Sequence, residues 1–234
     1  MLEKLRAEVL EANLELVRRG LVIYTFGNAS GVSREHGLVA IKPSGVPYDK
    51  MTAADMVITD LEGTVVEGKL RPSSDLATHV ALYRAFPSIG GVVHTHSRHA
   101  TAWAQASREI PCFGTTHADY FHGPVPLTRP LSAEEIEGDY EANTGVAIID
   151  RLQGLDPLGC PGVLVHGHAP FAWGKTVMDA AQIAVILEEL AAMAWMTVTI
   201  NPDAQPISQA QRDKHHFRKH GPKAYYGQAF PPKM

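Results

Sequence analysis

Apolar residues recur with two different periods along the chain, and the alternation between these periods predicts its elements. Leu2 and Leu5 begin a helical spacing with charged residues between them, which predicts an amphipathic helix that Gly20 ends. Ser132 and Glu135 form a capping box, which predicts the start of a further helical segment. Similar patterns predict helices over residues 74–86, 97–107, 143–151, 177–200 and 206–219.

Short apolar runs bounded by turn residues predict strands between these helices. We expect a strand over residues 38–42, a hairpin that pairs 56–59 with 65–66, and two Val-rich strands that end in histidines. Residues 24–31 and 114–121 are expected to be loops, because glycine and small polar residues are frequent in them. No repeat or interdomain linker interrupts the 234 residues, so the alternation of helices and strands predicts one α/β domain.

Both Val-rich strands end in the pattern His-x-His, first as His94 and His96 and then as His166 and His168. Residues i and i+2 of a strand project from the same face, about 6–7 Å apart. If the two strand ends meet, three or four imidazoles face one cavity, and a catalytic zinc typically takes three protein ligands. One such pattern would also fit a pair of histidines at the edge of the core. Two copies favour a metal site.

Hydrogen-bond donors suited to an anion gather at loop and strand-end positions. Ser73 and Ser74 open the helix at 74–86, and the N-terminus of a helix is a ready anion site. Taken alone, these serines fit plain helix capping. Further donors at similar positions favour a phosphate site, and they are Asn28, Lys42, Ser44 and Gly45.

Residues outside the strands could supply acid–base chemistry beside such a metal, and the candidates are Asp75, Asp119, Glu141, Tyr225 and Tyr226. Each also fits a structural role. Asp75 suits a helix cap, Asp119 suits a turn, and the tyrosines suit packing of the C-terminal segment. Composition and spacing leave these roles open.

Charge and cysteine usage narrow the class of protein. A net charge of −4 and a pI near 6.3 disfavour nucleic acid and anionic membranes as partners. The two cysteines have no CxxC spacing, and the N-terminus shows no apolar leader, so we expect a cytoplasmic protein. The apolar stretch at 177–200 contains Gln182, Glu188 and Glu189, which predicts a buried helix rather than a membrane span.

Several short blocks, in order along nearly the whole chain, resemble the class II aldolase/epimerase family. The blocks are Gly27-Asn28-Ala29-Ser30-Gly31, Lys42-Pro43-Ser44-Gly45, Pro72-Ser73-Ser74-Asp75, His94-Thr95-His96, residues 166–174, residues 214–221 and residues 224–228. The resemblance implies a single-domain, three-layer α/β/α sandwich around a largely antiparallel sheet over residues 1–234. It also implies a homotetrameric ring in which the C-terminal tail, 221–234, reaches a neighbouring subunit.

The same resemblance implies a set of site residues. Zinc would be held by His94, His96 and His168, with Asp75 at or beside the metal and His166 in a supporting position. The phosphate of the substrate would be bound by Gly27, Asn28, Lys42, Ser44, Gly45, Ser73 and Ser74. Asp119 and Tyr226 would be the acid–base residues, and Thr115, Glu141, His215 and Arg218 would surround the active site.

The implied activity is zinc-dependent epimerisation at C4 of L-ribulose 5-phosphate to D-xylulose 5-phosphate, through retro-aldol cleavage and re-addition. Arabinose and ascorbate breakdown both use this reaction. The alternative is an aldolase of the same family that cleaves a 1-phosphorylated deoxyketose such as L-fuculose 1-phosphate. Aldolases of the family have Glu where this chain has Asp75, and they favour Tyr where it has Asp119, so the epimerase is expected.

Two further alternatives are disfavoured. A non-enzymatic scaffold domain of the same fold would lack the metal ligands, which this chain keeps. A cupin-type barrel also uses His-x-His, but the long helices expected at 74–86 and 177–200 argue against an all-β barrel.

Overall fold

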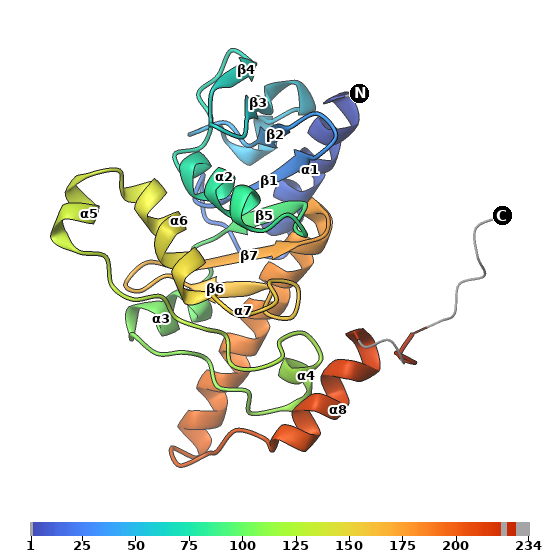
Figure 1. Cartoon of the computed structure of the whole chain (residues 1–234), viewed down its shortest axis with the longest axis vertical. Coiled ribbons are helices and arrows are strands. Elements are labelled where there is room, and N and C mark those ends of the chain that lie inside the picture. Colours follow the sequence, from blue (N-terminus) through green and yellow to red (C-terminus); the bar gives the residue numbers. More distant parts are fainter. Residues whose placement is uncertain (1, 221–223, 228–234) are drawn as a thin grey trace.

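One antiparallel sheet of seven strands organises the chain in a computed structural model, which describes residues 2–220 and 224–227 (Figure 1). The strands are β1 (Asn28–Ser33), β2 (Leu38–Ile41), β3 (Val57–Asp60), β4 (Val65–Glu67), β5 (Gly91–His94), β6 (Gly162–Leu164) and β7 (Pro170–Gly174). Their order in the sheet is β4-β3-β2-β1-β5-β7-β6, and every neighbouring pair is antiparallel. The largely antiparallel sheet predicted for the family is therefore confirmed.

Helices cover both faces of this sheet, which gives the expected three layers. Helices α1 (Leu2–Arg18) and α7 (Val177–Ile200) pack on one face, and α2 (Leu76–Ala85) and α6 (Tyr140–Arg151) pack on the other. Neighbouring residues of β5 show the alternation directly, because Val93 joins the core beneath α1 and α7 while Val92 joins the core beneath α2. The α/β/α sandwich is thus built from two apolar cores on opposite faces.

The other helices form a lobe beyond the sheet or lie in its connections. They are α3 (Arg98–Gln105), α4 (Thr115–Ala118), α5 (Ala133–Glu137) and α8 (Gln209–His220), with 3-10 turns at Tyr48–Lys50 and Ala53–Asp55. Figure 1 shows α3 against α7 and α4 against α8, and a third apolar core joins α3 to α7. Ser132 and Glu135 form the predicted capping box at the start of α5.

Two segments predicted as loops contain regular structure. Residues 28–33 form β1, whose small side chains let α1 lie close: a Cβ on Gly31 would come within 3.1 Å of Leu5 and Val9. The segment 114–121 contains the short helix α4. The small residues at 28–31 therefore reflect close packing of β1 against α1 rather than a loop. Those at 114–121 include a single helical turn, α4.

The two His-x-His patterns leave their strands earlier than predicted. β5 ends at His94, so His96 lies beyond it, and β6 ends at Leu164, so His166 and His168 lie in the turn that leads to β7. Gly167 makes this turn possible because its φ is +67°, a conformation that side chains disfavour. The histidines converge through turns rather than through one strand face.

Within the described residues, α7 is the one helix long and apolar enough to cross a membrane by length and composition alone. Its buried positions run from Val177 to Ala194 and pack on the sheet, α1 and α3. The segment up to Ala194 therefore agrees with the prediction of a core helix, whereas Trp195, Met196 and Ile200 beyond it are exposed.

Candidate metal centre

Three histidines from separate turns and strand ends meet in one cluster. One ring nitrogen from each of His94, His96 and His168 lies within 4.8 Å of the other two. Nδ1 of His94 donates to the carbonyl of Pro170 at 3.0 Å, and the ring stacks on Phe171 with centroids 4.3 Å apart. The Nε2 lone pair of His94 is therefore directed at the cluster, 3.1 Å from Nε2 of His96.

The cluster has the chemistry and spacing that a metal ion requires. Two nitrogens at 2.0–2.1 Å from a tetrahedral zinc lie roughly 3.3–3.4 Å apart, close to the His94–His96 separation. Burial lowers the pKa of His94 to about 4 and lowers the pKa values of His96 and His168. The three imidazoles are therefore neutral near pH 7, which is the form that binds metals.

His166, the fourth histidine of the two patterns, lies outside this cluster. Its Nε2 is 2.8 Å from the hydroxyl of Ser107. The second His-x-His thus contributes His168 to the cluster, while His166 ties the turn to the end of α3.

Asp75 lies beside the histidines at the start of α2. Its carboxylate accepts a hydrogen bond of 2.6 Å from Nδ2 of Asn28. Burial would raise its pKa, but His94, His79 and the Asn28 bond together hold the pKa below its ordinary value. Asp75 is therefore an ionised carboxylate at the edge of the histidine cluster.

All the residues predicted to bind the phosphate share a cavity with the cluster. The cavity has a volume of about 390 Å³ and is lined by Thr25, Phe26, Gly27, Asn28, Lys42, Ser44, Gly45, Ser73, Ser74, Asp75, His94, His96, Tyr140, Glu141 and His168. Gly27 is required at its position because a Cβ there would lie 2.8 Å from the carbonyl oxygen of His94. The fold thus joins a histidine end to an end rich in hydroxyl and amide donors.

Lys42 brings a buried positive charge to this cavity. Its side chain is only 2% exposed, and its Nζ donates to the carbonyl of Pro43 at 3.2 Å. Burial lowers its pKa. A buried ammonium with so little compensation favours an anion in the cavity.

The two predicted acid–base residues lie together, but they do not line this cavity. Arg218 of α8 makes two hydrogen bonds to the carboxylate of Asp119, at 3.0 and 2.6 Å. Burial would raise the pKa of Asp119, but Arg218, Lys219 and His215 outweigh it and lower the pKa. The ring of Tyr226 lies over the same cations, 5.0 Å from Cζ of Arg218 and 4.4 Å from Nζ of Lys219. Asp119 and Tyr226 therefore form one patch with α8.

The cavity also contains residues that the analysis of the sequence did not single out. These are Thr25, Phe26 and Tyr140. Tyr140 was missed because helix α6 was expected to begin at residue 143, whereas Asp139 caps it and Tyr140 begins it. Asp139 could have indicated this earlier start of the helix, because aspartate is a favoured N-cap residue.

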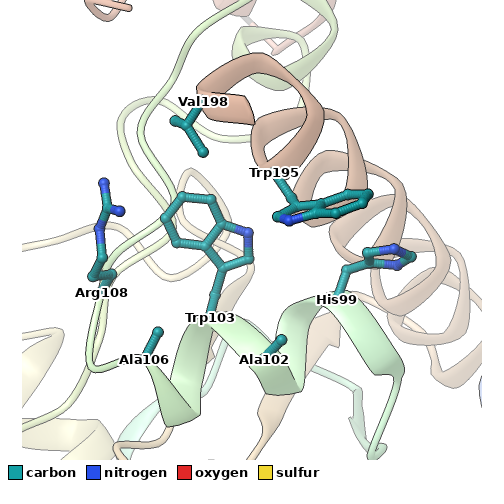
Figure 2. Close-up of a pocket in the computed structure, with 7 residues that line it drawn as sticks. All are labelled: His99, Ala102, Trp103, Ala106, Arg108, Trp195 and Val198. Atoms are coloured by element: carbon teal, nitrogen blue, oxygen red, sulfur yellow. The ribbon is translucent and has the colours of Figure 1, made fainter. Parts of the chain in front are cut away.

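His99, the next histidine along the chain, lies in a separate apolar pocket of about 320 Å³ between α3 and α7. Figure 2 shows its ring beside Trp195 of α7, with Trp103 further along α3. Its Nδ1 is 2.8 Å from the carboxylate of Glu188. His99 therefore provides a natural control for the clustered histidines.

Comparison with known proteins assigns the chain to a family. A model of the family described as Class II Aldolase and Adducin N-terminal domain matches residues 7–195. The chain belongs to the class II aldolase and epimerase family.

Particular members of the family are closely similar in sequence or fold. Proteins named L-ribulose-5-phosphate 4-epimerase UlaF from Salmonella paratyphi A and Salmonella typhi are 58% identical over 227 residues, which is 97% of this chain and all of theirs. A solved L-fuculose 1-phosphate aldolase superposes with a TM-score of 0.77 at 23% identity, over 91% of this chain and 94% of its own. YgbL from Klebsiella pneumoniae, described as a putative aldolase/epimerase/decarboxylase, superposes with a TM-score of 0.71 at 23% identity, over 92% of this chain and all of its own. These structures share the fold.

Two buried histidines outside the cluster predict how stability depends on pH. Burial lowers the pKa of His79 to about 3 and that of His117 to about 4. Because the unfolded chain takes up their protons near pH 6.5, the free energy of unfolding falls as the pH drops through 6, by up to about 1.4 kcal/mol per pH unit for each histidine. Urea denaturation of metal-free protein between pH 7 and 5 measures this slope. His117→Gln should reduce it, and identical slopes for parent and variant would contradict the prediction.

Proposed function

We propose that this chain is a zinc-dependent epimerase that converts L-ribulose 5-phosphate to D-xylulose 5-phosphate at C4. The observation that carries the proposal is a single cavity with three neutral histidines at one end and phosphate-type donors at the other. The 58% identity to proteins named as this epimerase, over almost the whole chain, supports the same substrate.

The donor-rich end of the cavity suits the 5-phosphate. Ser44, Ser73 and Ser74 offer hydroxyls, and Gly27, Asn28 and Gly45 surround them with backbone and amide groups. Lys42 would then pair its buried ammonium with the phosphate. These residues would keep the cleaved phosphorylated aldehyde bound, so that it can turn its other face before it adds again. Retention of this fragment is what separates an epimerase from an aldolase.

The histidine end suits the ketose oxygens. We propose that His94, His96 and His168 hold zinc, which polarises the carbonyl as a Lewis acid and stabilises the enolate charge when it is bound. Asp75 would hold Asn28 through the 2.6 Å bond and place a fixed negative charge beside the ion. The open side of the cluster then faces the substrate.

Epimerisation needs proton exchange with the C4 hydroxyl on two opposite faces of the aldehyde. We assign these two roles to the Asp119 carboxylate and the Tyr226 hydroxyl. Since both lie on the α8 patch and neither lines the cavity of its own chain, we propose that they serve the cavity of a neighbouring subunit. The family resemblance implies a homotetrameric ring, and we propose that such a ring contains the shared sites. The tail over residues 221–234 falls mostly outside the described residues, which include 224–227.

Asp75 provides a test of epimerase against aldolase chemistry. Asp75→Glu adds one methylene and moves the carboxylate toward the histidines, where it disturbs the Asn28 bond. We expect epimerisation to fall by roughly tenfold or more and release of free aldehyde to rise. The rate of epimerisation of L-ribulose 5-phosphate measures the first effect. The rates at which free aldehyde is released from L-ribulose 5-phosphate and L-fuculose 1-phosphate measure the second. A parent protein that cleaves the deoxyketose faster than it epimerises the pentulose would favour the aldolase.

The reaction itself is tested by incubating metal-loaded protein with L-ribulose 5-phosphate. We expect D-xylulose 5-phosphate to form, with only traces of free aldehyde. Absence of this product under conditions in which the protein is folded and metal-loaded would contradict the proposed function. We further propose that the enzyme acts in the cytoplasm on small sugar phosphates, with neither nucleic acid nor membrane as a partner.

A further inference from the structure

Tyr140 lies where the metal cluster meets helix α6. It is the first residue of α6, and its hydroxyl oxygen lies 3.3 Å from Nδ1 of His168. The two rings are 6.0 Å apart, and both line the cavity that contains His94 and His96. Tyr140 thus contacts the histidine that comes from the turn between β6 and β7.

The position of Tyr140 is fixed by the packing of α6 on α2. A Cβ on Gly145 would lie 2.8 Å from Cβ of Ala81, so the two helices approach as closely as a glycine allows. The hydroxyl of Thr78 donates to the carbonyl of Glu141 at 2.6 Å. Because Thr78 lies one turn beyond Asp75, the start of α6 is held to the same helix that presents Asp75 to the cluster.

The cluster needs such a partner at His168 for a chemical reason. A neutral imidazole has one protonated nitrogen and one lone pair, and the partner of one nitrogen decides which form is present. For His94 the carbonyl of Pro170 fixes the proton on Nδ1. Within the described part of the chain, the side chain of His168 has the Tyr140 hydroxyl as its hydrogen-bond partner.

We propose that Tyr140 is a positioning residue for the metal centre, which accepts a hydrogen bond from Nδ1–H of His168. The bond keeps the lone pair of His168 on Nε2 and holds the ring of this turn residue in the cluster before the metal arrives. This inference rests on the proposed zinc site.

Tyr140→Phe tests the proposal because it removes one oxygen atom and keeps the ring. Partners of metal-bound histidines typically contribute about ten- to hundredfold to metal affinity. We therefore expect the zinc affinity of Tyr140→Phe, measured by chelator competition near pH 7.5, to fall by at least about tenfold. The visible spectrum of the cobalt(II)-loaded variant should also change, because the His168 ring is no longer held.

Tyr48→Phe is the matched control. Tyr48 is buried near the same cavity, but its hydroxyl donates to the carbonyl of Gly27 at 2.9 Å. Its removal should leave zinc affinity and the cobalt spectrum unchanged. An equal loss of affinity in both variants, or no loss in Tyr140→Phe, would overturn the role of Tyr140. A parent protein that binds no zinc would overturn the metal site as well, whereas normal zinc binding without epimerisation would overturn only the proposed reaction.

Discussion

His94→Ala is expected to lower kcat/KM for L-ribulose 5-phosphate by roughly a thousandfold, because a bound metal supplies several kcal/mol of charge stabilisation. His94 is the best-fixed member of the cluster, with Nδ1 bonded to Pro170 and its ring stacked on Phe171. Chelation of the parent protein should have the same effect, and added zinc should restore the activity. Steady-state kinetics combined with elemental analysis measures both.

His99→Ala is the control for this prediction. His99 lies in the pocket between α3 and α7 and contacts Glu188 and Trp195 (Figure 2). The backbone N–H groups of His99 and Ala100 keep their bonds to Glu188 in this variant, so the start of α3 is preserved. We expect activity close to that of the parent. Full activity in metal-free parent protein, or equal losses in the two variants, would contradict the assignment of the cluster.

Mixed oligomers are expected to recover activity that neither variant has alone. Asp75→Asn subunits keep Tyr226 but have a damaged cavity beside the histidine cluster, which is called the metal side here. Tyr226→Phe subunits keep an intact metal side but lack the Tyr226 hydroxyl. Each variant should be nearly inactive by itself. If the α8 patch serves a neighbouring cavity, roughly a quarter of the interfaces in an equally mixed ring pair two intact halves. Co-expression, followed by mass spectrometry of the rings and an activity assay, measures the recovery.

A second mixture provides the control for this experiment. Asp75→Asn and His94→Ala both damage the metal side, so rings that combine them contain no intact site in either arrangement. They should stay inactive. If rings of Asp75→Asn and Tyr226→Phe, verified as mixed, are equally inactive, then Tyr226 acts in its own subunit and the shared site is wrong.

The sequence predicted correctly those helices and strands that depend on residues only a few positions apart. Helix α1, helix α7 and strand β2 follow periodicity closely, and the capping box of α5 depends on residues three apart. β1 was missed because its glycine and small polar residues serve long-range packing. Gly31 lies against α1, so its meaning depends on residues more than twenty positions away.

In the site, too, local sequence patterns identified some residues, whereas contacts between distant residues could not be predicted. The His-x-His spacing singled out four histidines, and the family resemblance selected His94, His96 and His168 from them. The strand geometry inferred from the spacing was wrong, since His96 and His168 lie beyond their strands. The contact of Tyr140 with His168 joins residues 28 positions apart. Nothing in the local sequence encodes that contact, because it depends on how α6 packs against α2.

The fate of the C4 hydrogen distinguishes cleavage of the C3–C4 bond from removal of a proton at C4. Metal-loaded protein is given L-ribulose 5-phosphate in deuterium oxide, and the product is examined by NMR. Cleavage and re-formation of the C3–C4 bond leave the C4–H bond intact, so we expect D-xylulose 5-phosphate with protium at C4. Deuterium at C4 would show that a proton is removed from carbon instead, and would contradict retro-aldol epimerisation in this cavity.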